Sequence, residues 1–571
     1  MSNKRWDYIN KTCDKTLVCN LARELNVPTV IASVLVNRGI CNEPDARSYL
    51  NKAISCVRHP FELKDSQKAA SRIKDAIKNN EKIVIYGDYD VDGITATSIL
   101  YMFLREQDAN VSFYIPNRSD EGYGINMLAL QKFKKDGASL LITVDCGITA
   151  VGEVELARAL GIDVIITDHH TCKEELPKAY AVINPKQPDC SYPFKSLAGV
   201  GVAFKLVLAL ALEMGYSARE YFDKYIDLVA IGTIADVVSL TDENRIFVAN
   251  GINNIKNTKN VGLKALFETS GLADKSINAG SISFAIAPRI NAAGRVGSAS
   301  LAVELLVTDS PERAREIALT LEEENRERQK TENEILKDAL LMIADMEDAK
   351  KKKVFELAKE DWHHGVIGIV ASRIVDRFYK PTILISLKDN LGKGSGRSVK
   401  GFNLFDALTN CQDILLKYGG HELAAGLGLN YADVDEFDKQ INKYAEDVLK
   451  DNQLVPSISI DAELDTSEIS LVTAQALLVL EPFGMGNSQP VFSLCDGAIT
   501  SVRTLSDGKH CKFSVTKNGK YFDFVGFGMG TLTEHFVVGD KIDVAFTMGI
   551  NHYLGEKNLQ LIIKDARASI Q

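Results

Sequence analysis

The sequence contains no CxxC pair, although ten cysteines are scattered along its 571 residues. A structural zinc site or a redox dithiol is therefore not expected, and unpaired thiols suit a reducing compartment. No apolar run reaches the roughly 20 residues that a membrane-spanning helix needs, and the polar start MSNKRWDYIN lacks the apolar core of a signal peptide. We therefore expect a cytoplasmic protein without membrane contact.

The sequence also lacks an overall excess of positive charge. Its formal net charge is −10 at pH 7, whereas domains that bind nucleic acids are usually basic. The charge is uneven, because residues 350–400 carry twelve Lys and Arg against five Asp and Glu. The total charge therefore weakens a nucleic-acid-binding interpretation without excluding it. Internal repeats, low-complexity tracts and coiled-coil heptads are missing as well.

The length predicts several domains rather than one core. Residues 1–60 have the pattern of short helices. Over residues 61–305, β-branched apolar runs alternate with helical stretches. This alternation is typical of an α/β domain whose parallel sheet is covered by helices on both faces.

A long, highly charged helix is predicted over residues 306–348. Ser310 suits its N-cap and Pro311 its first position, and a helix this polar usually bridges domains. A second, smaller α/β domain is predicted over residues 349–452. Over residues 453–571, short alternating strands separated by glycine-bearing turns predict a small closed β-barrel, with an OB-fold as the favoured kind.

Carboxylate and imidazole side chains directly follow the apolar runs of the first α/β domain. The runs end in GDYDVDG, TVDCG and TDHH, where parallel strands should finish. The carboxyl ends of parallel strands meet at one edge of a sheet, and ligands gather there. Each side chain alone fits a turn or a helix cap, but their joint placement favours a metal site. The side chains are Asp88, Asp90, Asp92, Asp145, Asp168, His169 and His170.

Asp236 adds a further carboxylate, which we expect inside the apolar helix that contains GTIADVV. Burying a carboxylate is costly unless it is paired or bound to a metal. Oxygen-rich ligands with one or two histidines favour Mn²⁺ or Mg²⁺ over zinc. More than four such groups suggest two ions about 3.5–4 Å apart, an arrangement that hydrolyses phosphoesters.

The motifs resemble those of a known superfamily. Asp168-His169-His170 matches the signature of the DHH phosphoesterases, and GDYDVDG resembles their first motif. GKGSGRSVKGFN and KYGGHELAAGLGL are similar to the DHH-associated domain. APRINAAGR, DWHHGVIGIVASRI and the expected barrel narrow the resemblance to the RecJ family of bacterial single-strand-specific exonucleases, over roughly residues 60–570. The chain stops soon after the barrel, so we expect it to lack an extra C-terminal domain that some relatives have.

This resemblance implies roles for the residues at the sheet edge. It places Asp88, Asp168 and His170 in the catalytic site, with Asp88 behind the ligands and His170 polarising the scissile phosphate or stabilising the leaving oxygen. The alternative for His170 is only to orient the neighbouring imidazole. The implied metal ligands are Asp90, Asp92, Asp145, His169 and Asp236.

The resemblance also implies substrate contacts in the second domain. Ser395 and Arg397 of GSGRS look like phosphate contacts, because the flanking glycines permit close approach and a guanidinium grips phosphate with two bonds. The alternative is a glycine-rich surface turn. His421 in YGGHELAAG is expected over the active site, although a helix-entry cap is the alternative. His363 and His364 are expected to close the start of an apolar helix rather than to bind metal.

Two further arginines match family positions that contact the DNA backbone. They are Arg118 in FYIPNR and Arg289 in APRINAAGR, and a buried structural ion pair is an equally weighted alternative for Arg289. Aromatic side chains of the barrel, including Phe513, Tyr521 and Phe527, are candidates for stacking on bases. Strand alternation places many such aromatics inside the barrel instead.

These roles imply a 5′-to-3′ exonuclease on single-stranded DNA that uses two Mn²⁺ or Mg²⁺ ions, releases mononucleotides and acts in DNA repair and recombination. Single-stranded DNA, a single-stranded-DNA-binding protein and a helicase are the implied partners. A DHH phosphodiesterase of short oligonucleotides or cyclic dinucleotides is the nearest alternative, but those enzymes lack the barrel. A family pyrophosphatase is disfavoured by the GSGRS and GGH pair. A non-catalytic single-strand-binding scaffold is disfavoured because every motif carboxylate is present.

Overall fold

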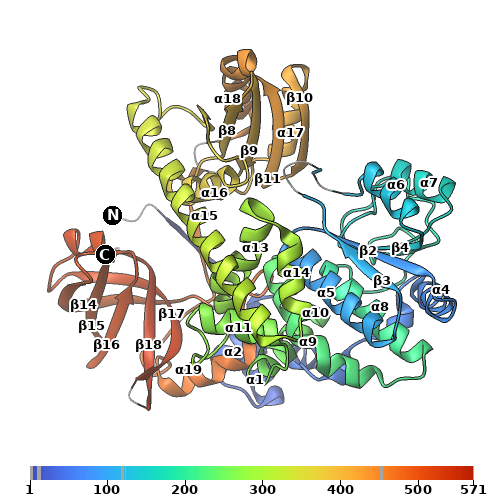
Figure 1. The fold of residues 1–571 in the computed structure, drawn as a ribbon. Helices are drawn as coiled ribbons and strands as arrows, with labels where there is room; N and C mark the ends of the chain where they lie inside the picture. The colour runs from blue at the N-terminus through green and yellow to red at the C-terminus, as the bar shows by residue number, and fades with distance from the viewer. Residues whose placement is uncertain are drawn as a thin grey trace.

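The computed structural model describes residues 4–9, 14–117, 121–122, 124–450, 454–553 and 555–569. Figure 1 shows three sheet-containing bodies, with a long helix running from the first toward the second and the barrel lying beside the N-terminal segment. Within these residues, every helix is too short or too polar to cross a lipid bilayer.

Five parallel strands form the central sheet of the first domain, in the order β3-β2-β4-β5-β6. Their alternate residues enter different cores, so that Ile83 and Ile85 face one helical layer while Val84 and Tyr86 face the other. The predicted parallel α/β fold is confirmed. The strands are β2 (Lys82–Gly87), β3 (Val111–Tyr114), β4 (Ala138–Val144), β5 (Asp163–Thr167) and β6 (Ala181–Ile183).

Helices cover both faces of this sheet. The larger core takes residues from α4, α5, α8 and α9, and the smaller one from α6 and α7. Their bounds are α4 (Ser66–Lys78), α5 (Val91–Glu106), α6 (Met127–Lys135), α7 (Val151–Ala159), α8 (Gly199–Glu213) and α9 (Ala218–Ala235). Further helical segments complete the domain: α10 (Asp242–Ile255), α11 (Val261–Thr269), α12 (Ala279–Ser281), the π-helical η3 (Ile282–Ile286), α13 (Ala287–Val296) and α14 (Ala299–Val307).

The position of Asp90 determines the start of α5. The helix begins at Val91, because Asp90 is its N-cap and accepts the Gly93 N–H at 3.1 Å. Asp92 consequently lies in the first turn of this helix.

The end of α9 differs from the expectation. Asp236 is the C-cap of this helix and not a residue of its interior. The next residue, Val237, has a φ of 61°, which a β-branched residue rarely adopts, so the chain turns away at once. The carboxylate therefore sits at a helix end, beside the edge of the sheet.

The connecting helix is α15 (Pro311–Asp345), and Ser310 caps it by accepting the Arg313 N–H, as predicted. It leads to a mixed sheet in the order β10-β11-β9-β8-β7, in which only β7 and β8 run parallel. Helix α16 packs on one face, and α17 and α18 pack on the other. The elements are β7 (Phe355–Glu360), α16 (Ile367–Phe378), β8 (Thr382–Lys388), β9 (Leu391–Arg397), α17 (Leu404–Asn410), β10 (Leu415–His421), β11 (Ala424–Asn430) and α18 (Val434–Val448).

The predicted barrel is present and closes through pairing of its first and fourth long strands, β14 and β17. Short strands β12 and β13 and helix α19 precede it. The elements are β12 (Ser457–Ile460), β13 (Ala462–Glu463), α19 (Leu471–Leu477), β14 (Phe492–Leu505), β15 (His510–Lys517), β16 (Lys520–Gly526), β17 (Lys541–Tyr553) and β18 (Glu556–Ala568).

The N-terminal segment shares its core with the barrel. Helices α1 (Lys15–Leu25), α2 (Thr29–Asn37) and α3 (Glu43–Leu50) contribute side chains to the same apolar cluster as the barrel strands. Strand β1 (Arg5–Tyr8), which the helical expectation missed, pairs in parallel with β12. Four residues carry too little periodicity to predict a strand whose partner lies at the other end of the chain.

Candidate metal centre and substrate cleft

The loop after β2 brings the first carboxylates to the carboxyl edge of the sheet. Asp88 is 6% exposed, and Asp90 stands at the N-cap of α5. Asp145 follows β4 directly, with a φ of 60° that turns its side chain back toward this loop. Carboxylate oxygens of these three residues all lie within 4.8 Å of one another. That arrangement fits one small, hard cation.

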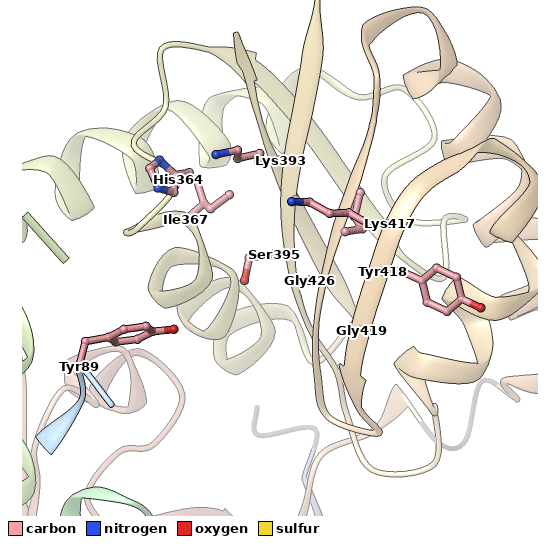
Figure 2. Close-up of a pocket in the computed structure, with 11 residues that line it drawn as sticks. Tyr89, His364, Ile367, Lys393, Ser395, Lys417, Tyr418, Gly419 and Gly426 are labelled. Atoms are coloured by element: carbon pink, nitrogen blue, oxygen red, sulfur yellow. The ribbon is translucent and has the colours of Figure 1, made fainter. Parts of the chain in front are cut away.

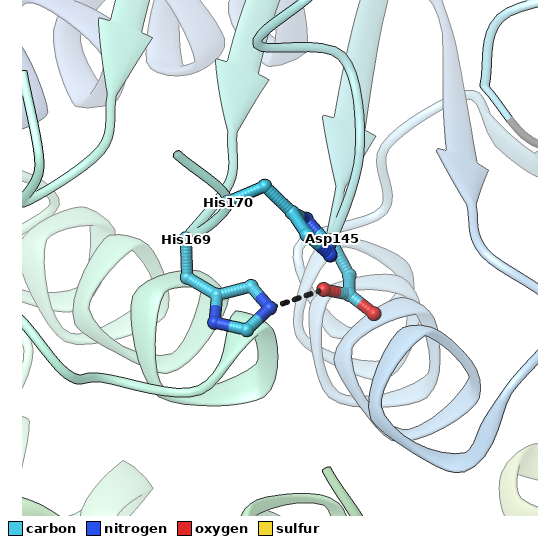
Figure 3. A group of neighbouring side chains, drawn as sticks. All are labelled: Asp145, His169 and His170. Carbon is cyan, nitrogen blue, oxygen red and sulfur yellow. Dashed lines mark ion pairs between the residues drawn. The ribbon is translucent and has the colours of Figure 1, made fainter. Parts of the chain in front are cut away.

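A second triad shares no residue with the first. It consists of Asp92, His169 and Asp236, whose ligand atoms satisfy the same distance limit. A third group links the two triads through Asp145, His169 and His170, and Figure 3 shows these side chains converging from the ends of β4 and β5. The structure thus brings all five predicted metal ligands together, and Asp88 lies beside them as a sixth residue.

The ring of His169 shows that this cluster suits a metal. Nε2 lies 3.2 Å from Asp145 Oδ1, and Nδ1 lies 3.6 Å from Asp236 Oδ2, yet neither nitrogen has a hydrogen-bond partner among the described residues. Burial lowers the pKa of His169 to about 3, so the ring is neutral. Buried polar atoms normally have partners, and a divalent cation would supply them here.

The pKa values of the neighbouring carboxyl groups also indicate a metal site. Burial raises the pKa of Asp92 to about 7 and that of Asp236 to about 9, and nearby carboxylates add to both shifts. Burial and the same neighbours raise the pKa of Asp145 well above its usual value. Ionised carboxylates therefore repel one another at this edge, and a divalent cation would stabilise their charged forms.

Asp92 is held by the start of helix α8. Its two oxygens accept the backbone N–H groups of Gly199 and Val200, each at 2.7 Å. A Cβ at position 199 would lie 2.4 Å from Oδ1 of Asp145. Glycine at this position therefore lets the helix end approach two carboxylates at once. The sequence motifs did not indicate Gly199 as a functional residue, because its role depends on contacts with Asp92 and Asp145, which lie far away in the sequence.

Asp168 positions His170 and is saturated by hydrogen bonds. Its Oδ1 contacts Nδ1 of His170 at 2.7 Å and accepts the backbone N–H groups of His169 and His170, while Oδ2 accepts the Ile148 N–H at 2.9 Å. Burial opposes ionisation of Asp168, but the His170 ring and these N–H groups hold its pKa below the usual value. Asp168 thus holds the His170 ring in place, and a catalytic role for either residue stays a prediction.

Three of the predicted substrate residues share one face of the second sheet. Arg397 on β9 and His421 on β10 both pair with Ala424 on β11, and Ser395 lies two residues from Arg397. The Arg397 guanidinium donates to Ser395 Oγ at 3.2 Å and to the Gly396 carbonyl at 2.7 Å. These bonds orient the guanidinium beside the Ser395 hydroxyl.

The two predicted DNA-contacting arginines have different outcomes. Arg289 lies on α13 and pairs with Glu322 of α15 at 2.5 Å, with its side chain 14% exposed. The geometry is that of the structural ion pair, and a DNA contact for Arg289 stays a prediction. Arg118 lies outside the described residues. Among those residues, His363 and His364 join no metal-ligand group, and the His363 carbonyl accepts the N–H groups of Val366 and Ile367 at the start of α16.

A cavity of about 440 Å³ lies between Tyr89, in the loop that carries Asp88 and Asp90, and the second sheet. Tyr89, between two candidate ligands, lines it on one side, and Ser395 lines it on the other (Figure 2). Lys393 and Lys417 also line it and were not singled out from the sequence. Alternation along GKGSGRS places Lys393, Ser395 and Arg397 on one face, so the signal for Lys393 was present.

Comparison with known proteins identifies the family. The DHH family N-terminal domain matches residues 82–233, the DHHA1 domain matches 350–447 and the RecJ OB domain matches 460–565. The single-stranded-DNA-specific exonuclease RecJ of Bacillus subtilis is 41% identical over 571 residues, which cover 100% of this chain and 71% of that protein. The chain belongs to the RecJ family.

Two solved structures of RecJ from Thermus thermophilus extend the comparison. The Mn²⁺ complex has a TM-score of 0.86 at 30% identity, over 100% of this chain and 80% of that one. The Mg²⁺ complex has a TM-score of 0.80 at 29% identity, over 100% and 79%. The predicted fold class is confirmed, and as a RecJ family member the chain is a metal-dependent nuclease that uses Mn²⁺ or Mg²⁺. The number of ions and the individual site residues stay predictions.

Proposed function

We propose that this chain is a 5′-to-3′ exonuclease that hydrolyses single-stranded DNA to mononucleotides. The cavity between Tyr89 and Ser395 supports the proposal, because Tyr89 stands between Asp88 and Asp90 in the sequence and Ser395, the candidate phosphate contact, lines the cavity from the second sheet. Its volume of about 440 Å³ lies within the range of sites for a single small ligand. One nucleotide would bridge the two sides, with its 5′-phosphate at Ser395 and its 3′-phosphodiester at the carboxylates.

Each group of the site then has a physical role. Mn²⁺ or Mg²⁺ at the carboxylates would activate water and neutralise charge on the phosphoryl oxygens. Asp168 holds the His170 ring by its Nδ1 atom, and this ring would polarise the scissile phosphate or stabilise the leaving oxygen. The start of α8 holds Asp92 through two N–H groups, so this carboxylate keeps its place when a cation binds.

The direction of digestion needs an anchor for one end, since a metal site alone cuts any diester presented in line. We assign this anchor to Ser395 and Arg397, with Arg118 as a further candidate. The Arg397 fork is already oriented by the Gly396 carbonyl, and a planar fork fits a phosphate better than an ammonium group does. A charge-assisted hydrogen bond contributes roughly 1.5–3 kcal/mol, which corresponds to about a ten- to hundredfold preference.

The test compares a 5′-phosphorylated strand with its 5′-hydroxyl twin at subsaturating concentration. The phosphorylated strand should be degraded faster, and Arg397→Lys should shrink that ratio without changing Mn²⁺ binding. Arg377→Lys, at an exposed position on α16, is the matched control and should leave the ratio unchanged. Equal rates for the two wild-type substrates, or a ratio that survives in Arg397→Lys and in Arg397→Ala, would place the anchor elsewhere.

We further propose that the activity serves DNA repair and recombination in the cytoplasm. Long single strands in cells are produced by helicases and covered by single-stranded-DNA-binding proteins, so both are proposed partners. The exposed aromatic side chains of the barrel, Tyr521 and Phe527, are 74% and 53% exposed and are suited to stacking on bases. Phe513 is fully buried and belongs to the barrel core.

A further inference from the structure

Two lysines face the cavity from either side of strand β11. Lys393 on β9 and Lys417 on β10 both pair with Gly428 of β11, so they lie in one row across three strands. Ser395 and Gly419 form the adjacent row through Gly426. Directly paired residues and alternate residues share a face of a sheet, and Figure 2 shows both lysines extending beside Ser395.

The sheet surface in the row beside the lysines is open, whereas Gly428, between them, lies under Lys417, whose Cγ would be 3.1 Å from a Cβ at that position. A Cβ at Gly419 would meet nothing within 4 Å, and one at Gly426 would meet only the Gly394 carbonyl oxygen at 3.7 Å. Neither glycine has a positive φ, so neither is required by backbone conformation or by packing against protein. Their missing side chains leave room over the sheet for a ligand.

The charge of the cavity is one-sided. Lys393 and Lys417 line it, and no carboxylate does among the described residues. Across the described part of the chain, neither lysine forms an ion pair with an Asp or Glu side chain. Two ammonium groups facing one hollow without a counter-charge are best balanced by an anion that carries several negative charges.

The lysine row lies beyond the proposed 5′-phosphate anchor. Lys393 precedes Ser395 by two residues on β9, which is roughly 6.6–6.8 Å along a strand. In Figure 2 the row lies farther from Tyr89 than Ser395 does. A phosphate chain that starts at Ser395 and points away from the metal edge would reach the two lysines.

We propose that Lys393 and Lys417 form a subsite for the β- and γ-phosphates of a 5′-triphosphorylated single strand. This subsite rests on the proposed function, since it extends the 5′-phosphate anchor. Hydrolysis adds water across the P–O3′ bond that follows the first nucleotide. The hydroxyl joins phosphorus and the proton joins O3′, so the first product is a nucleoside 5′-triphosphate and the remaining strand carries a 5′-monophosphate.

The experiment uses one oligonucleotide with either a 5′-monophosphate or a 5′-triphosphate, digested by the full chain with Mn²⁺. The wild type should cleave the triphosphorylated strand and release a nucleoside triphosphate first. The double variant Lys393→Ala/Lys417→Ala should lower kcat/KM on the triphosphorylated strand, relative to the monophosphorylated one, by about tenfold or more. Lys388→Ala/Lys400→Ala removes two exposed lysines outside the cavity and should leave that ratio unchanged.

The outcomes separate this subsite from the proposed function. A wild type that cuts the monophosphorylated strand but leaves the triphosphorylated one intact would overturn the subsite alone. An unchanged ratio in the double variant, including equal slowing on both strands, would do the same. A wild type that cuts neither strand from its 5′ end would overturn the proposed function itself.

Discussion

Replacing Gly199 by alanine should weaken metal binding without disturbing the fold. The added Cβ would lie 2.4 Å from Asp145 Oδ1 and 2.6 Å from its Cγ, so the carboxylate must move. The same helix end donates two N–H groups to Asp92. Alanine favours a helix over glycine by up to about 1 kcal/mol, so helix α8 itself should persist.

The expected magnitude follows from what the displaced groups do. Changing a group that orients a metal ligand typically costs about 10–100-fold in affinity. At a Mn²⁺ concentration of about 100 times the wild-type Kd, binding stabilises the native state by about 2.7 kcal/mol, and a variant with roughly hundredfold weaker binding would retain only about 0.4 kcal/mol of this. Isothermal titration with Mn²⁺ measures the affinity directly, and circular dichroism verifies the fold.

Gly201→Ala is the matched control on the same helix. Its Cβ would meet Leu197 Cδ2 at 3.5 Å and Phe247 at 3.9 Å, which are ordinary contacts. This variant should bind Mn²⁺ like the wild type. If Gly199→Ala binds Mn²⁺ as tightly as Gly201→Ala does, the close approach of α8 has no role in the metal centre.

The remaining predictions concern the ligands, the strand and the barrel. Asp145→Ala should abolish nuclease activity at any Mn²⁺ concentration while the circular dichroism spectrum stays native, and substantial activity would remove Asp145 from the mechanism. Blunt duplex DNA should resist digestion while a 5′ overhang is consumed up to the junction, because a cavity of about 440 Å³ suits a single small ligand; equal rates on both substrates would contradict this. Tyr521→Ala and Phe527→Ala should each weaken binding to a long strand, since a stacked base contributes about 1–3 kcal/mol; unchanged affinity in a filter-binding assay would assign the barrel another purpose.

The sequence was sufficient to predict which side chains converge at the carboxyl edge of the parallel sheet. The β-branched runs before GDYDVDG, TVDCG and TDHH indicated the strand ends, and parallel pairing then required the polar residues after them to converge. The structure shows this convergence for every candidate ligand. The helix boundaries were less predictable, because Asp90 as an N-cap and Asp236 as a C-cap are polar residues whose roles depend on one or two local bonds.

Contacts between segments that lie far apart in the sequence could not be predicted from sequence motifs. The packing of α1 to α3 into the barrel core and the β1–β12 pair join the two ends of the chain. Arg245, only 1% exposed, donates to the carbonyls of Val479 and Leu480 at 3.0 and 2.8 Å. A deletion of residues 455–571 would therefore expose a shared core and remove the carbonyl partners of the buried Arg245 guanidinium. Point substitutions on the barrel surface test DNA binding more cleanly.

Digestion of a 5′-labelled single strand shows from which end the protein degrades DNA. With Mn²⁺ present and excess unlabelled competitor added after mixing, we expect the label to appear at once as a mononucleotide, with no intermediate lengths. The same strand labelled at its 3′ end should instead shorten progressively. A ladder of shortening fragments from the 5′-labelled strand would show digestion from the 3′ end and contradict the account.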